Sequence, residues 1–214
     1  MMARRVAQLL VGLFLYGFSL GLMVRAAVGV GPWDVFSQGV SLKTGLSFGL
    51  LTNIIGALVL LLWIPLRQRP GVGTVANVLL IGPSAEVGLA LVPSPDELWA
   101  RILLFVGGLL LLAVASGLYI GARLGPGPRD GLMTGLNSRF GVPIWLGRTI
   151  VEVSVLGIGW LLGGNVGFGT VAFALFIGPL VGRTIPFFRV PLPAAPAPAP
   201  VVEPVETAPT RPTS

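Results

Sequence analysis

The sequence predicts an all-α protein, a polytopic membrane helix bundle with about six transmembrane helices in two inverted repeats, each with a short half-helix that begins at a Gly-Pro pair. Three observations support this fold class. The 214 residues are 54% hydrophobic and only 10% charged, whereas soluble domains carry roughly 25% charged residues. The mean hydropathy is +0.90. Several motifs recur along the chain at one constant spacing.

Composition also limits the chemistry. The chain contains no cysteine and no histidine, which excludes disulfides, thiolate nucleophiles, Cys/His zinc sites and histidine acid–base catalysis. The net charge of +6 comes from basic residues in short segments between apolar runs rather than from one patch. We therefore expect a protein surrounded by lipid bilayer that binds no nucleic acid, carries no cofactor or metal, and is not an enzyme.

The repeat is visible when each residue is placed beside the one 96 positions later. Gly-Pro-Trp-Asp at 31–34 then meets Gly-Pro-Arg-Asp at 127–130, and Gly-Val-Gly-Thr-Val-Ala at 71–76 meets Gly-Phe-Gly-Thr-Val-Ala at 167–172. Because the offset never changes, we expect a first repeat over 1–98 and a second over 99–190. The tail, 191–214, is rich in proline and alanine and is predicted to be disordered.

Each repeat contains three segments long enough to span a membrane, which needs about 20 apolar residues. We expect spans near 6–24, 46–66, 73–93, 102–121, 144–163 and 169–187. Pro83 and Pro179 fall inside the third span of each repeat, so both spans are predicted to bend or break. With three spans per repeat, the second repeat enters the membrane inverted. The distribution of Lys and Arg favours cytoplasmic N- and C-termini in the cell membrane.

The Gly-Pro motifs predict half-helices over 32–44 and 128–140. Proline suits the first helical position, an acid in the first turn faces the positive end of the helix dipole, and Gly45 is a natural stop. A helix of about 12 residues is roughly 18 Å long, too short for a hydrocarbon core of about 30 Å. The two elements are therefore either interfacial or re-entrant.

Polar residues at membrane depth are the candidates for a site. Asp34 and Asp130 are equivalent positions that either cap their helices or together bind a cation or a proton. Arg148 and Glu152 share a helix face and either belong to the site or form a local ion pair. The complete set of candidate substrate- or ion-binding residues is Asp34, Asp130, Pro32, Pro128, Gln38, Thr134, Arg148, Glu152 and Glu86.

Four stretches resemble the YczE branch of the YczE/YitT family of bacterial membrane proteins: "GVGPWDVFSQG", "LLLWIPLRQRPGVGTVANVLLIGP", "GLYIGARLGPGPRDGLMTGL" and "VEVSVLGIGWLLGG". The resemblance covers most of residues 10–187. It implies a polytopic protein of the cytoplasmic membrane. It brings no substrate and no catalytic residue with it.

Taken together, the inverted repeat and the paired aspartates favour a small secondary transporter or permease of an unknown small solute or ion. The alternative is a membrane scaffold or accessory subunit that assists a partner enzyme or exporter and transports nothing. A homo-oligomer and a membrane partner protein are both compatible with the sequence.

Overall fold

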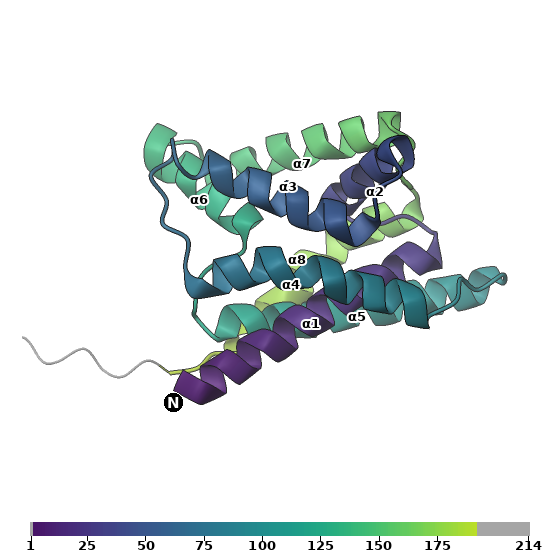
Figure 1. Cartoon of the computed structure of the whole chain (residues 1–214), viewed down its shortest axis with the longest axis horizontal. Helices are drawn as coiled ribbons and strands as arrows, with labels where there is room; N and C mark the ends of the chain where they lie inside the picture. Colours follow the sequence, from purple (N-terminus) through teal and green to yellow (C-terminus); the bar gives the residue numbers. More distant parts are fainter. Residues whose placement is uncertain (1, 192–214) are drawn as a thin grey trace, which may run out of the picture.

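The computed structural model describes residues 2–191, and over this range it consists of helices without a strand (Figure 1). The predicted tail lies outside the described residues apart from Pro191. The eight helices are α1 (Met2–Ala26), α2 (Pro32–Thr44), α3 (Phe48–Leu62), α4 (Val72–Leu91), α5 (Leu98–Gly121), α6 (Pro128–Phe140), α7 (Ile144–Leu161) and α8 (Phe168–Phe188).

The helices form two layers (Figure 1). In the lower layer of the view, α1 packs against both α5 and α4, and α5 also packs against α8. In the upper layer, α2 packs against α7, while α3 and α6 lie together. The layers therefore mix elements from the two halves of the chain, and each half-helix contacts a long helix of the other half.

The polytopic helical class is confirmed. Five helices in the described part are long and apolar enough to cross a membrane: α1, α4, α5, α7 and α8. A sixth span results if α2 and α3, between which the chain bends by 116°, count together as one. The helix α3 has 15 residues, shorter than the predicted span over 46–66, because the chain turns after Leu62.

The two half-helices begin and end where the sequence predicts. Their N-cap residues have nearly the same extended backbone, with φ −63° and ψ 157° at Gly31 and φ −64° and ψ 156° at Gly127. Both end at a glycine in the left-handed region, Gly45 with φ 74° and Gly141 with φ 68°. Glycine reaches this conformation without the steric cost of a Cβ.

Of the two outcomes predicted for the third spans, a bend or a break at the proline, the break is wrong. The helix α4 runs continuously through Pro83, and α8 through Pro179. Proline cannot donate to the carbonyl four residues earlier. In α4 that carbonyl, on Leu79, instead accepts a hydrogen bond from Asn53 Nδ2 at 3.2 Å, and Asn53 Oδ1 accepts from the Gly82 N–H at 2.9 Å. A side chain of α3 thus replaces the missing bond.

Contacts between the halves are reciprocal at several places. The Gly73 N–H, at the start of α4, donates to the Leu124 carbonyl before α6 at 2.8 Å. The Gly169 N–H, at the start of α8, donates to the Val28 carbonyl before α2, also at 2.8 Å. The two donors, Gly73 and Gly169, are 96 positions apart, and so are the two acceptors, Val28 and Leu124. Each half-helix is thereby anchored by the third long helix of the other half.

The reciprocity is incomplete, and the clearest difference lies between the pairs α3–α4 and α7–α8. The helix α3 packs closely on α4, whereas the equivalent pair, α7 and α8, has at most sparse contact. Gly82 of α4 abuts the Gly49 carbonyl and Asn53 of α3, so that a Cβ on Gly82 would overlap them. At the equivalent Gly178 of α8, no atom lies within 4 Å of an added Cβ. The two layers are closed along α3 and α4 and separated along α7 and α8.

Candidate functional site

A cavity of about 380 Å³ lies between the two layers, and both Gly-Pro motifs line it. The residues 31–34 and 127–130 form part of its wall, together with side chains from α1, α3, α4, α5, α7 and α8. Ligand pockets commonly have volumes of about 300–1,000 Å³. The cavity therefore has room for a small solute.

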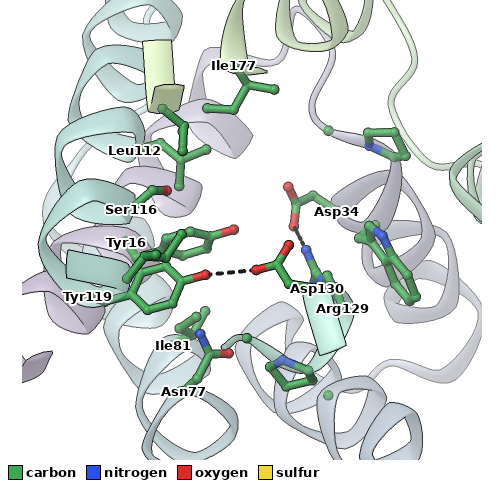
Figure 2. A pocket seen from close by; sticks show the side chains of 18 of the residues that line it. Tyr16, Asp34, Asn77, Ile81, Leu112, Ser116, Tyr119, Arg129, Asp130 and Ile177 are labelled. Atoms are coloured by element: carbon green, nitrogen blue, oxygen red, sulfur yellow. Dashed lines mark hydrogen bonds and ion pairs between the residues drawn. The ribbon is translucent and has the colours of Figure 1, made fainter. Parts of the chain in front are cut away.

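The two half-helices meet at this cavity through equivalent residues. Trp33 and Arg129 each follow the proline of their motif, and the Arg129 guanidinium lies over the Trp33 ring at 4.9 Å from its centroid. Arg129 also approaches the other half-helix, with Nη1 at 4.0 Å from Asp34 Oδ1 (Figure 2). A cation over an indole ring is attracted by the ring's electron-rich face. This stack joins the beginnings of α2 and α6.

Asp34 is buried, with 3% of its surface exposed. Its Oδ1 atom has no hydrogen-bond partner among the described residues. Since the distance to Arg129 is long for a charge-assisted hydrogen bond, which is usually about 2.7–2.9 Å, the carboxylate is only partly compensated. A buried polar atom without a partner costs free energy, which makes Asp34 an unusual feature of an otherwise well-bonded bundle.

Asp130 has different surroundings. It lies in the cavity, remains exposed, and accepts a hydrogen bond from the Tyr119 hydroxyl to Oδ2 at 3.3 Å (Figure 2). Tyr119 in turn packs edge-on against Tyr16, with ring centroids 5.7 Å apart and an interplanar angle of 84°. Both tyrosines line the cavity. They form an aromatic wall on the side of α1 and α5, facing the two half-helices.

Arg148 and Glu152 of α7 also line the cavity. Arg148 Nε donates to Glu152 Oε1 at 2.9 Å, and the two side chains are 53% and 31% exposed. The predicted i,i+4 pair is therefore present, and it lies on the side where α7 is separated from α8. An exposed pair of this kind contributes little to stability, about 0–1 kcal/mol.

The remaining wall is mostly apolar. Ile81, Leu112 and Ile177 contribute apolar side chains, of which Ile81 and Leu112 are buried, while Asn77 and Ser116 supply polar atoms (Figure 2). An apolar wall with a few placed polar groups is typical of a site for a small organic molecule.

Of the nine candidate residues, six line the cavity and three do not. The six are Asp34, Asp130, Pro32, Pro128, Arg148 and Glu152. Glu86 instead accepts from the Gly49 N–H at the start of α3, Gln38 accepts from the Asn165 N–H, and the Thr134 hydroxyl bonds the Gly131 carbonyl. Each of these three side chains is hydrogen-bonded to a backbone group outside the cavity wall.

Sequence reasoning missed the aromatic wall. Tyr16 and Tyr119 lie in long apolar helices, and neither belongs to a repeated motif. A signal was nevertheless present, because these are the two tyrosines of the whole chain and a tyrosine in an apolar helix brings a hydroxyl that needs a partner. Within residues 2–191, no group of three or more Asp or Glu side chains is arranged to hold a metal ion.

Comparisons with known proteins show the family of the chain. A Haemophilus influenzae protein, "Uncharacterized protein", is 38% identical over 178 residues, which are 83% of this chain and 82% of that one. The "Uncharacterized membrane protein YczE" of Bacillus subtilis is 31% identical over 82% of each chain. No solved structure matches. A family model described as a family of unknown function, DUF6198, matches residues 3–186. The chain therefore belongs to the DUF6198 family and, like its relative YczE, is a membrane protein.

Proposed function

We propose that the protein is a small secondary transporter of the cytoplasmic membrane whose solute site is the cavity between the two layers. The observation that carries this proposal is the meeting of two half-helices, each starting at a Gly-Pro pair, at one cavity inside an apolar bundle. Interrupted helices that end at a central site are a recurring device of secondary transporters, where they supply polar groups without a lipid-exposed loop.

The difference between the two helix pairs supports the same function. Transporters built from inverted repeats expose their site alternately by moving one bundle of helices against the other. Here the layers are closed along α3 and α4 and separated along α7 and α8. In the proposed transport cycle these two arrangements are exchanged, so that α7 and α8 close on each other and α3 and α4 separate. We propose that the two halves, 1–98 and 99–190, are inverted repeats and that both termini are cytoplasmic.

In this scheme the two aspartates have different tasks. Asp130, exposed in the cavity, contacts the solute. Asp34, buried beside Arg129, holds that arginine in place and links the two half-helices. Arg148 and Glu152 lie at the separated edge and contact the solute as it enters.

Flux through proteoliposomes tests the proposal. Liposomes containing the full chain are loaded with a bacterial small-molecule extract, and mass spectrometry identifies solutes that leave faster than from protein-free liposomes. We expect at least one solute to leave, and Asp130→Asn to abolish most of its flux. Asp96→Asn, the same change at an exposed aspartate outside the cavity, is the matched control and should transport normally.

Two results would reject a transport role. One is the absence of any protein-dependent flux from folded protein. The other is full flux in the folded double variant Asp34→Asn, Asp130→Asn. Co-purification of a stoichiometric membrane partner in the absence of flux would instead support the scaffold or accessory role.

A further inference from the structure

The charged groups of the cavity are unevenly paired. Arg148 is hydrogen-bonded to Glu152, and Arg129 lies nearest to Asp34. Over residues 2–191, no Lys or Arg nitrogen lies within 4.0 Å of Asp130. The carboxyl of Asp130 has the Tyr119 hydroxyl as its hydrogen-bond partner. If all five charged groups are ionised, the site carries one negative charge more than its cations balance.

We propose, on the basis of the transport site described above, that this cavity binds a primary ammonium group attached to a small apolar body, with the ammonium donating to Asp130. An ammonium group has three N–H donors and no acceptor. It would supply the missing positive charge beside Asp130. The hydroxyl oxygens of Tyr16 and Tyr119, which point toward the two aspartates (Figure 2), could accept from its remaining N–H groups.

The beginnings of α2 and α6 could in principle attract an anion, because a helix N-terminus is electropositive. Here the N-terminus of each helix has the carboxylate of an aspartate from its own first turn close to it. A Cβ on Gly31 would lie 3.1 Å from Asp34 Oδ2, and one on Gly127 would lie 3.3 Å from Asp130 Oδ2. The positive ends of both helices therefore face carboxylates of their own first turn. The Asp130 carboxylate in the cavity can therefore accept a further hydrogen bond from a ligand.

A bare metal cation suits the cavity less well than an organic one. Hard cations take about six or more oxygen ligands, whereas the wall of the cavity includes the apolar side chains of Ile81, Leu112 and Ile177. Those side chains suit an alkyl body. The unpaired Oδ1 atom of the buried Asp34 is a second sign that the polar groups of this site are incomplete without a ligand.

A primary ammonium group can come from two sources. One is a free amine in solution. The other is the ethanolamine headgroup of a phospholipid, which could reach the cavity along the edge where α7 is separated from α8. The chemistry at Asp130 is the same for both, so the experiment has one arm for each source.

The experiment uses the full chain in nanodiscs of phosphatidylcholine and phosphatidylglycerol, two lipids without a primary amine. Calorimetry measures the binding of n-butylammonium, butyrate and tetramethylammonium. We expect n-butylammonium to bind and butyrate not to bind. Tetramethylammonium has the charge but no N–H, and should bind at least about tenfold more weakly, the loss expected for a hydrogen bond to a charged group. A second arm adds phosphatidylethanolamine to the nanodisc.

Variants locate the binding. Asp130→Asn should weaken n-butylammonium binding about ten- to a hundredfold, and Asp96→Asn should leave it unchanged. If phosphatidylethanolamine competes with the amine, the headgroup is the source; if it has no effect, a free amine is the source. The ligand class is overturned if butyrate binds as well as n-butylammonium, if tetramethylammonium binds equally, or if no amine binds in either arm.

These comparisons between ligands are made on the wild-type protein, so they hold even if Asp130→Asn fails to fold. Binding in a nanodisc involves no flux. Amine binding without protein-dependent flux would reject the transport function and keep the ligand class. Flux of other solutes without amine binding would reject the ligand class and keep the transport function.

Discussion

Asp34 and Asp130 occupy equivalent positions in the two motifs and have acquired different surroundings. Asp34 is buried next to Arg129, whereas Asp130 is exposed in the cavity and bonded by Tyr119. The difference follows from the residue before each aspartate, which is Trp33 in one motif and Arg129 in the other. Because Arg129 lies over the Trp33 ring, it is close to Asp34. Asp130 has no such cation among the described residues and is the carboxylate that we assign to the ligand.

Asn53 of α3 stabilises α4 at its internal proline. Its side chain bonds both the Leu79 carbonyl and the Gly82 N–H, which keeps α4 continuous through Pro83. Asn53→Ala should lower the free energy of unfolding by about 1–3 kcal/mol, because both side-chain hydrogen bonds are lost. Thermal unfolding in detergent measures this loss.

Asn137→Ala is the matched control, since Asn137 donates to the Val142 carbonyl at an exposed site where water can replace it. An equal loss of stability in the two variants would contradict the role given to Asn53.

The sequence predicts part of the site at residue level. A Gly-Pro pair followed by an acid specifies a helix start, so Asp34 and Asp130 were found from local pattern. Tyr16 and Tyr119 were not, because only the packing of α1 on α5 brings them to the cavity. The place of Glu86, outside the cavity, was not predictable for a related reason: its partner is the Gly49 N–H of another helix, and no local pattern indicates a contact between distant segments.

The helix pairs α3–α4 and α7–α8 occupy corresponding places in the two halves but pack differently. The bounds of the half-helices were predictable because their capping signals are local. The continuity of α4 was not, because a side chain from α3 compensates for Pro83. The close packing of α3 on α4 depends on Gly82, whose equivalent in the other pair, Gly178, faces open space.

Alanine at these two glycines tests the asymmetry of the helix pairs. Gly82→Ala should destabilise the protein by about 1–3 kcal/mol, because the new methyl overlaps the Gly49 carbonyl and Asn53. Gly178→Ala should leave stability unchanged or raise it by up to about 1 kcal/mol, since alanine favours helix over glycine. Thermal unfolding in detergent gives both values.

Each glycine variant serves as the control for the other, because the substitution and the helical position are the same. Equal destabilisation by both changes would mean that α7 and α8 pack as closely as α3 and α4. The separated edge of the cavity would then not exist in the protein in detergent.

For the whole molecule, composition was enough to predict a membrane protein. The lengths of the apolar runs predicted about six spans. The division into layers was not predictable, since it pairs α2 with α7 and α3 with α6 across the two halves. The inverted relation between the halves stays a prediction based on the odd number of spans per repeat. It is also the basis of the proposed transport cycle, in which the two halves exchange their closed and separated helix pairs.

Cysteine accessibility tests this relation directly, and the chain has no native cysteine. Lys43 and Arg139 are equivalent exposed residues near the ends of α2 and α6. In intact cells, a membrane-impermeant maleimide should label Lys43→Cys, and should label Arg139→Cys only after permeabilisation. Labelling of both variants from the same side would contradict the inverted arrangement and the transport cycle built on it.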